Sequence, residues 1–135
     1  MSKSKAHKVD FRIYYEDTDA GGVVYYANYL KFAERARTEL LRSKGINQTK
    51  LAESQGILFV VKSVNMELKL PARLDDIITI KTEVEEISGA RINMKQTLVK
   101  SSQDIAFIDV QVVCINKNFR PQRIPEEIKS KIKKD

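Results

Sequence analysis

The sequence predicts an α+β fold in which one antiparallel sheet wraps around one long central helix. Three observations predict it. One segment alternates between apolar and polar residues near the start of the chain, the one long stretch of helical periodicity follows, and four more alternating segments come after it with short connections. The chain has 135 residues, the length of one domain, so we expect residues 1–135 to form a single unit.

The first two expected elements are a strand over residues 9–16 and the long helix. The apolar positions of the strand follow a period of two: Val9, Phe11, Ile13 and Tyr15. After the Gly21-Gly22 pair the period becomes helical. The apolar face of this helix consists of Tyr29, Phe32, Ala33, Ala36 and Leu40. Either Asn28 caps the start of the helix or the first turn begins a little earlier, and Gly45 should follow its end.

The rest of the chain predicts a short helix and then strands. The short helix should cover residues 48–54, with Asn47 as its cap and Gly56 as its terminator. Alternating segments predict strands over 58–70, 78–84, 92–98 and 106–114. Ser88-Gly89 should form a turn, and Pro125 should open a short basic helix. One sheet around one helix is the hotdog arrangement, and its exposed edges favour a homodimer or a homotetramer.

Composition narrows the possible environments and partners. A single cysteine, Cys114, rules out an intramolecular disulfide, and its apolar neighbours predict a buried structural thiol. No apolar run reaches the length of a membrane span, so we expect a cytoplasmic protein. The net charge of +6 is concentrated in residues 1–8 and 117–135. These basic ends are either solvated tails or a surface that attracts phosphates or anionic lipid. In the second case we expect at most peripheral contact with a membrane. No aromatic residues alternate with these lysines, so nucleic acid is not an expected partner.

The stretch from Tyr14 to Tyr29 has the strongest chemical content. Three carboxylates, Glu16, Asp17 and Asp19, precede two glycines and a helix start. Glycines allow close backbone approach, and a helix start offers free N–H groups with partial positive charge. Asp19 is either a turn residue that binds its own backbone, or a carboxylate that attacks a thioester carbonyl or activates water. Spacing alone leaves both interpretations open.

Other catalytic arrangements find little support in the sequence. On a strand, Asp17 and Asp19 would share one face while Glu16 would point to the other. The single histidine, His7, lies in the basic first segment, so neither a metal cluster nor a serine or cysteine triad is expected. We therefore expect no metal and no cofactor.

The motif itself resembles a known family. Residues 15–29 and the run from Phe32 to Glu39 resemble the YbgC-type acyl-CoA thioesterases associated with the Tol–Pal system, within the 4-hydroxybenzoyl-CoA thioesterase group of hotdog proteins. The resemblance continues through Pro71–Asp76, Val110–Cys114, Arg120-Pro121 and Ile124-Pro125. It implies hydrolysis of an acyl-CoA to free CoA and a carboxylic acid without a cofactor.

Residue by residue, the resemblance assigns roles within the motif. The catalytic aspartate of the family falls on Asp19, which leaves Asp17 as a local structural residue. The backbone N–H that holds the thioester carbonyl falls on Tyr26, where many relatives have histidine. Since this donor belongs to the main chain, the oxyanion contact should survive the change. Whether Asp19 acts as a nucleophile or as a general base stays open.

The resemblance also implies residues that bind the substrate. Arg91 and Arg120 are candidates for the coenzyme phosphates, because arginine binds phosphate with two parallel hydrogen bonds. The remaining candidates for substrate binding are Gly22, Val24, Gly56 and Phe59. Gly56 and Phe59 would line the acyl pocket, either in the same subunit or across the interface from the partner subunit. Acyl-CoA is the expected substrate, and acyl carrier protein is a second candidate partner. The alternative function is a non-catalytic module that grips acyl-CoA or acyl carrier protein near the membrane.

Overall fold

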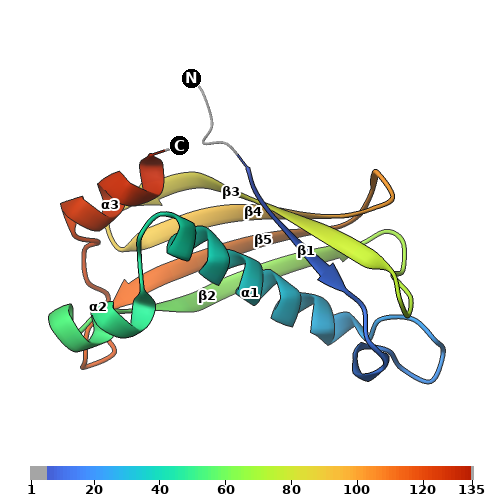
Figure 1. Cartoon of the computed structure of the whole chain (residues 1–135). Helices are drawn as coiled ribbons and strands as arrows, with labels where there is room; N and C mark the ends of the chain where they lie inside the picture. The colour runs from blue at the N-terminus through green and yellow to red at the C-terminus, as the bar shows by residue number, and fades with distance from the viewer. Residues whose placement is uncertain (1–5, 135) are drawn as a thin grey trace.

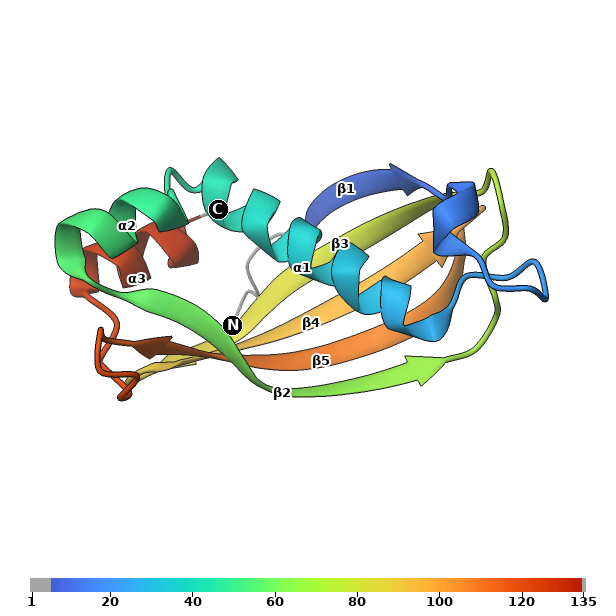
Figure 2. The ribbon, with the colours of Figure 1, turned by 90° about the horizontal axis from the view of Figure 1, so that it is seen from below.

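The computed structural model describes residues 6–134 and has the expected architecture. A five-stranded antiparallel sheet, in the order β1-β3-β4-β5-β2, curls around the long helix α1 (Figure 1). Figure 2 shows the helices on one face of the curved sheet. The elements are β1 (His7–Arg12), a 3-10 turn (Tyr15–Asp17), α1 (Tyr26–Ser43), α2 (Gln48–Gln55), β2 (Leu58–Leu68), β3 (Ile77–Ser88), β4 (Arg91–Lys100), β5 (Gln103–Ile115) and α3 (Glu126–Lys133).

The sheet has two edges of different character. β3, β4 and β5 are consecutive neighbours joined by tight turns, whereas β1 and β2 come from either side of α1 and form the edges. β1 is short and carries three charged side chains, Lys8, Asp10 and Arg12, that protect an edge against further pairing. β2 is an unusually long edge strand that pairs only with β5 among the described residues.

The core lies between α1 and the sheet. The predicted apolar face of α1 is buried at every position, which confirms the helical periodicity. One core cluster surrounds the first half of α1, and a second joins its last turns to α2, α3 and the far ends of the strands. A polar group also lies beneath the helix: the fully buried Gln96 donates to the Ala33 carbonyl at 2.9 Å and to Thr82 Oγ1 at 3.1 Å. Gln96 accepts from Arg37 at 3.0 Å, and burial lowers the pKa of that guanidinium.

The predicted end of the first strand is wrong, and of the two alternatives for the long helix the earlier start is the correct one. The first strand ends at Arg12 instead of continuing to residue 16, and Tyr15–Asp17 form a 3-10 turn. Glu16 and Asp17 therefore do not alternate across the two faces of a strand, contrary to the prediction. α1 begins at Tyr26, with Tyr25 rather than Asn28 at the cap position, because the Asn28 side chain donates instead to the Asp17 carboxylate.

The other predicted boundaries are correct to within a few residues. Asn47 caps α2 by accepting from the Lys50 N–H at 3.0 Å. Gly45 and Gly56 follow the two helices with positive φ values of 80° and 67°, the conformation that favours glycine at a helix end. The strands are mostly longer than predicted, and the turn at Ser88-Gly89 lies where expected.

The single cysteine is a core residue, as its apolar neighbours predicted. Cys114 is fully buried in the core, and burial raises the pKa of its thiol, so it is an unreactive structural residue. Within residues 6–134, no helix is long and apolar enough to cross a membrane.

Candidate active site

Asp19 lies at the tip of a tight hairpin that leads into α1. Thr18 and Val24 face each other across this hairpin, the Asp19 N–H donates to the Val23 carbonyl at 2.9 Å, and the Gly22 N–H donates back to the Asp19 carbonyl at 3.0 Å. The Gly21 N–H donates to Asp19 Oδ1 at 2.8 Å. The turn interpretation of Asp19 is thus confirmed. The side chain is nevertheless exposed, and its Oδ2 atom accepts no hydrogen bond from the described residues.

The two glycines of the hairpin serve different purposes. Gly22 has a φ of 80°, which favours glycine, and the space beside its Cα is open. A Cβ on Gly21 would lie 3.2 Å from Asp19 Oδ1. Gly21 therefore leaves room for the carboxylate in the orientation that its own N–H fixes.

Asp17 is buried and ties the hairpin to the helix. Its Oδ2 accepts from the Tyr14 N–H at 2.8 Å, its Oδ1 accepts from the Asn28 side chain at 3.0 Å, and its carbonyl accepts from the Tyr25 N–H at 3.0 Å. With a side chain whose two oxygens are both engaged, Asp17 is the local structural residue that was expected.

The start of α1 provides a free backbone donor beside this hairpin. Tyr26 is the first helical residue, so its N–H has no acceptor within the helix, and no other acceptor for it occurs among the described residues. The hairpin places Asp19 opposite Val23, three residues before Tyr26. The Tyr26 side chain is 57% exposed, and its ring contacts that of Tyr25 with centroids 5.0 Å apart.

A loop below the hairpin fixes it against the core. The Val24 N–H donates to the Ala72 carbonyl at 2.8 Å, and the Ala72 N–H donates to the Tyr29 hydroxyl at 3.0 Å. Burial raises the pKa of Tyr29, despite the opposing effect of the Ala72 hydrogen bond. The Val24 side chain packs in the core, so only its backbone lies toward the hairpin surface.

The same loop is held by an ion pair. Lys100 lies 2.9 Å from Asp76, which also accepts from the Arg73 N–H at 2.7 Å. Burial of Asp76 would raise its pKa, but the hydrogen bonds from Lys100 and Arg73 outweigh this effect and lower it.

Sequence reasoning missed the aromatic surroundings of the hairpin. Tyr14, Tyr15 and Tyr25 are all strongly exposed, with Tyr15 at 82%. Exposed aromatic side chains on the segments that flank a hairpin are typical of a ligand or subunit contact. The sequence contains these tyrosines, but the alternation assigned Tyr15 to the apolar face of a half-buried strand and so concealed its exposure.

The other predicted substrate residues lie at the opposite end of α1 in the same chain. Gly56 follows α2, and a Cβ there would meet the Lys117 side chain at 2.9 Å. Phe59 lines a cavity of about 100 Å³ between α1 and the sheet, together with Glu34 and Arg37. This cavity lies along the second half of α1, and Glu34 is about 12 Å along the helix axis from its first residue, beside which the Asp19 hairpin lies.

Arg91 and Arg120 lie at this opposite end as well. Arg91 lines a cavity of about 550 Å³ with Lys62, Phe119 and Pro121. Arg120 belongs to the loop that forms part of this wall, and its N–H donates to Asn116 Oδ1 at 3.2 Å. The structure therefore forms two groups: Asp19, Gly22, Val24 and Tyr26 in one, and Gly56, Phe59, Arg91 and Arg120 in the other. Lys62 and Phe119 are additions that sequence reasoning did not provide.

Comparison with known proteins decides the family. Residues 14–132 match the thioesterase-like superfamily. The chain is 44% identical over 120 residues to the acyl-CoA thioesterase YbgC of Haemophilus influenzae, covering 88% of both chains. The chain belongs to the YbgC family of acyl-CoA thioesterases. The acyl-CoA thioester hydrolase YbgC of Escherichia coli O6:H1 is 40% identical over 124 residues, covering 90% of this chain and 92% of the relative.

Solved structures confirm the hotdog fold of this YbgC-family chain. A probable thioesterase from Bartonella henselae has a TM-score of 0.85 at 38% identity, covering 89% of this chain and 99% of the other. A 4-hydroxybenzoyl-CoA thioesterase variant complexed with 4-hydroxybenzoyl CoA reaches a TM-score of 0.91 at 19% identity, covering 96% and 99%. That second likeness establishes the fold alone.

Proposed function

We propose that Asp19 and the Tyr26 N–H form the catalytic centre with which this thioesterase hydrolyses acyl-CoA to free CoA and a carboxylic acid. The observation that supports it is the exposed Asp19 carboxylate, with one oxygen held by Gly21 and the other free, in the hairpin that ends at the unpaired N–H of α1. A donor at a helix start stabilises the negative charge that develops on a thioester oxygen.

Two chemical routes fit this arrangement. In the nucleophilic route, Asp19 Oδ2 bonds to the carbonyl carbon, the C–S bond breaks with release of CoA thiolate, and water then hydrolyses the mixed anhydride. In the general-base route, Asp19 removes a proton from a water whose oxygen attacks the carbonyl, and the thiolate leaves from the resulting tetrahedral intermediate. Single-turnover hydrolysis in heavy-oxygen water distinguishes the routes, because only the nucleophilic one places the label in the Asp19 carboxylate.

A homodimer paired through the β2 edge would bring the remaining predicted substrate-binding residues to the catalytic centre. β2 exposes Leu58, Val60, Val61, Val64 and Leu68 along its length. An unpaired apolar edge of this kind is suited to pairing with a second copy. A twofold axis near the middle of β2 makes the two β2 strands antiparallel. The Leu68 end of one protomer, where the Asp19 hairpin lies, then comes beside the Leu58 end of the other, where Phe59 lies.

The Arg91 cavity is the proposed position of the coenzyme. Arg91 and Lys62 provide positive charge for phosphates, and the exposed ring of Phe119 offers a surface for an adenine base. Arg120 extends from the same loop, between Phe119 and Pro121, and would contribute a further phosphate contact.

A panel of acyl-CoA substrates that vary in chain length and aromatic character tests the function. We expect release of free thiol from at least one class with turnover that saturates. The alternative is a non-catalytic module for acyl-CoA or acyl carrier protein. Tight acyl-CoA binding without thiol release across the whole panel would support that alternative and contradict the hydrolase.

A further inference from the structure

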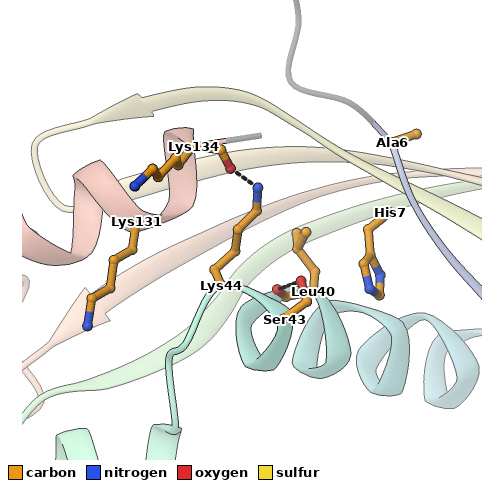
Figure 3. Close-up of a pocket in the computed structure, with 7 residues that line it drawn as sticks. All are labelled: Ala6, His7, Leu40, Ser43, Lys44, Lys131 and Lys134. Atoms are coloured by element: carbon orange, nitrogen blue, oxygen red, sulfur yellow. Dashed lines mark hydrogen bonds between the residues drawn. The ribbon is translucent and has the colours of Figure 1, made fainter.

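A cavity remote from Asp19 lies where the start of β1 meets the ends of α1 and α3 (Figure 3). Its volume is about 440 Å³. The lining residues are Ala6, His7, Leu40, Ser43, Lys44, Lys131 and Lys134. Since Asp19 precedes α1 and Lys44 follows it, the whole length of the helix separates this cavity from the proposed catalytic centre.

The lining of this cavity is positively charged. Among the described residues, its lining includes three lysines and no acidic side chain. Lys44 donates to the Lys134 backbone carbonyl, which holds its ammonium group between α1 and α3 (Figure 3). Lys131 lies 3.5 Å from Glu127, but both side chains are largely exposed, and such a surface pair is weak. Within residues 6–134, no other acidic side chain forms an ion pair with these three ammonium groups.

A polar atom in the same cavity lacks a partner. His7 Nδ1 is buried and has no hydrogen bond to the described residues. Buried polar atoms nearly always have a partner, so an unpaired one indicates a missing water, ion or ligand. The basic lining and the unpaired nitrogen are independent observations, and both point to an anion with hydrogen-bonding oxygens.

We propose that this cavity binds the phosphate group of a small anionic molecule. Lysine ammonium groups bind phosphate as point charges, and here they come from α3 and from the residues that directly follow α1 and α3. His7 provides one further hydrogen bond from β1. The cavity is larger than a phosphate ion requires, so it also accommodates part of the molecule that carries the phosphate. This site is separate from the proposed catalytic centre and would fill independently of it.

The test uses His7 as a reporter, because it is the only histidine in the sequence. In the full chain at low salt, titration with inorganic pyrophosphate should shift the His7 imidazole resonances in a saturable way. The Lys44→Met/Lys131→Met variant should lose at least about tenfold in affinity and keep wild-type thioesterase turnover. The matched control is Lys129→Met/Lys133→Met, which also removes two charges, both from α3, at residues that do not line the cavity. Arg91→Ala should also leave the His7 titration unchanged.

A second arm identifies the source of the phosphate. Co-sedimentation is measured with vesicles that contain phosphatidylglycerol and with vesicles of phosphatidylcholine alone. Binding to the first kind only, lost in Lys44→Met/Lys131→Met, would identify a lipid headgroup as the source. The absence of a saturable His7 shift with pyrophosphate, combined with no vesicle binding that depends on Lys44 and Lys131, would overturn the proposal. Equal losses in Lys129→Met/Lys133→Met and in Lys44→Met/Lys131→Met would also overturn it, because they would indicate general charge attraction.

Discussion

Two aspartates two positions apart have different roles because their oxygens have different partners. Both carboxylate oxygens of Asp17 accept hydrogen bonds, one of them from the helix side chain Asn28. Asp19 has one engaged oxygen and one free oxygen, and its side chain lies in solvent. Asp17 is thus a fixed anchor, while Asp19 has an oxygen available for chemistry.

Gly21→Ala tests whether the orientation of Asp19 matters. The new Cβ would lie 3.2 Å from Asp19 Oδ1 and would displace the carboxylate. We expect kcat to fall by about tenfold or more, because small misplacements of reacting groups are costly. The melting temperature should change little, since Gly21 does not have a positive φ. Steady-state kinetics and thermal unfolding measure the two effects, and an unchanged kcat would contradict the orienting role.

Asp17→Ala tests the anchor. The change leaves the Tyr14 N–H and the Asn28 amide without their acceptor, so the free energy of unfolding should fall by about 1–3 kcal/mol. Urea denaturation provides the measurement. Asp104→Ala is the control, since this exposed carboxylate on β5 has no such partners. Similar losses for both variants would show that Asp17 is not an anchor.

At the scale of elements, hydrophobic periodicity predicted the helices and strands whose apolar residues recur at regular spacing. It did not predict the boundaries that depend on a single side-chain contact. The apolar face of α1 and the four later strands follow local patterns, and they were predicted correctly. The end of β1 and the start of α1 depend on Asp17, which takes the Asn28 side chain away from a capping role. That contact joins residues eleven positions apart, and no local pattern contains it.

A substitution on the β2 edge tests the proposed pairing of two β2 strands in a homodimer. Val64 lies in the middle of β2 and is 44% exposed, so Val64→Lys should place a charge against its own copy near the twofold axis. We expect the dissociation constant of the dimer to rise by about tenfold or more in analytical ultracentrifugation. Thr49→Lys, on the exposed surface of α2, is the control. A dimer that persists unchanged in Val64→Lys would exclude β2 as the interface.

At the scale of the whole molecule, the predicted site residues fall into two groups that lie apart in one chain. Asp19 and Tyr26 are close in sequence and lie at one end of α1, whereas Gly56, Phe59, Arg91 and Arg120 lie at the other end. A single chain does not bring the two groups together. The contribution of a second protomer depends on how two folded surfaces pair, and this information is not contained in the spacing of residues.

Mixed dimers test this composite site. If one protomer provides Asp19 and its partner provides Phe59, then Asp19→Asn and Phe59→Glu, each inactive alone, form one intact site in each heterodimer. Random exchange of equal amounts should restore about a quarter of wild-type activity. The absence of recovery, after exchange of subunits has been verified by mass spectrometry, would contradict the shared site.

The loop beneath the hairpin predicts a dependence of stability on pH. The pKa of Asp76 is lowered in the folded state, so its contribution is present above the unfolded value of about 4 and is lost as pH falls through the folded value. In Asp76→Asn the unfolding free energy should decrease at neutral pH by about 1 kcal/mol or less and should depend less on pH in the acidic range. Urea denaturation from neutral pH downward measures this, and a constant difference between the two proteins at all pH values would refute it.

The turnover of Asp19→Asn tests the central claim most directly. The change preserves the shape and the hydrogen bond from Gly21 but removes the charge, so we expect kcat on an acyl-CoA substrate to fall by at least about a hundredfold. Circular dichroism and the melting temperature should match the wild type. Glu16→Gln, which neutralises an exposed carboxylate three positions away, should keep wild-type turnover. Wild-type turnover in folded Asp19→Asn would show that Asp19 is not the catalytic carboxylate.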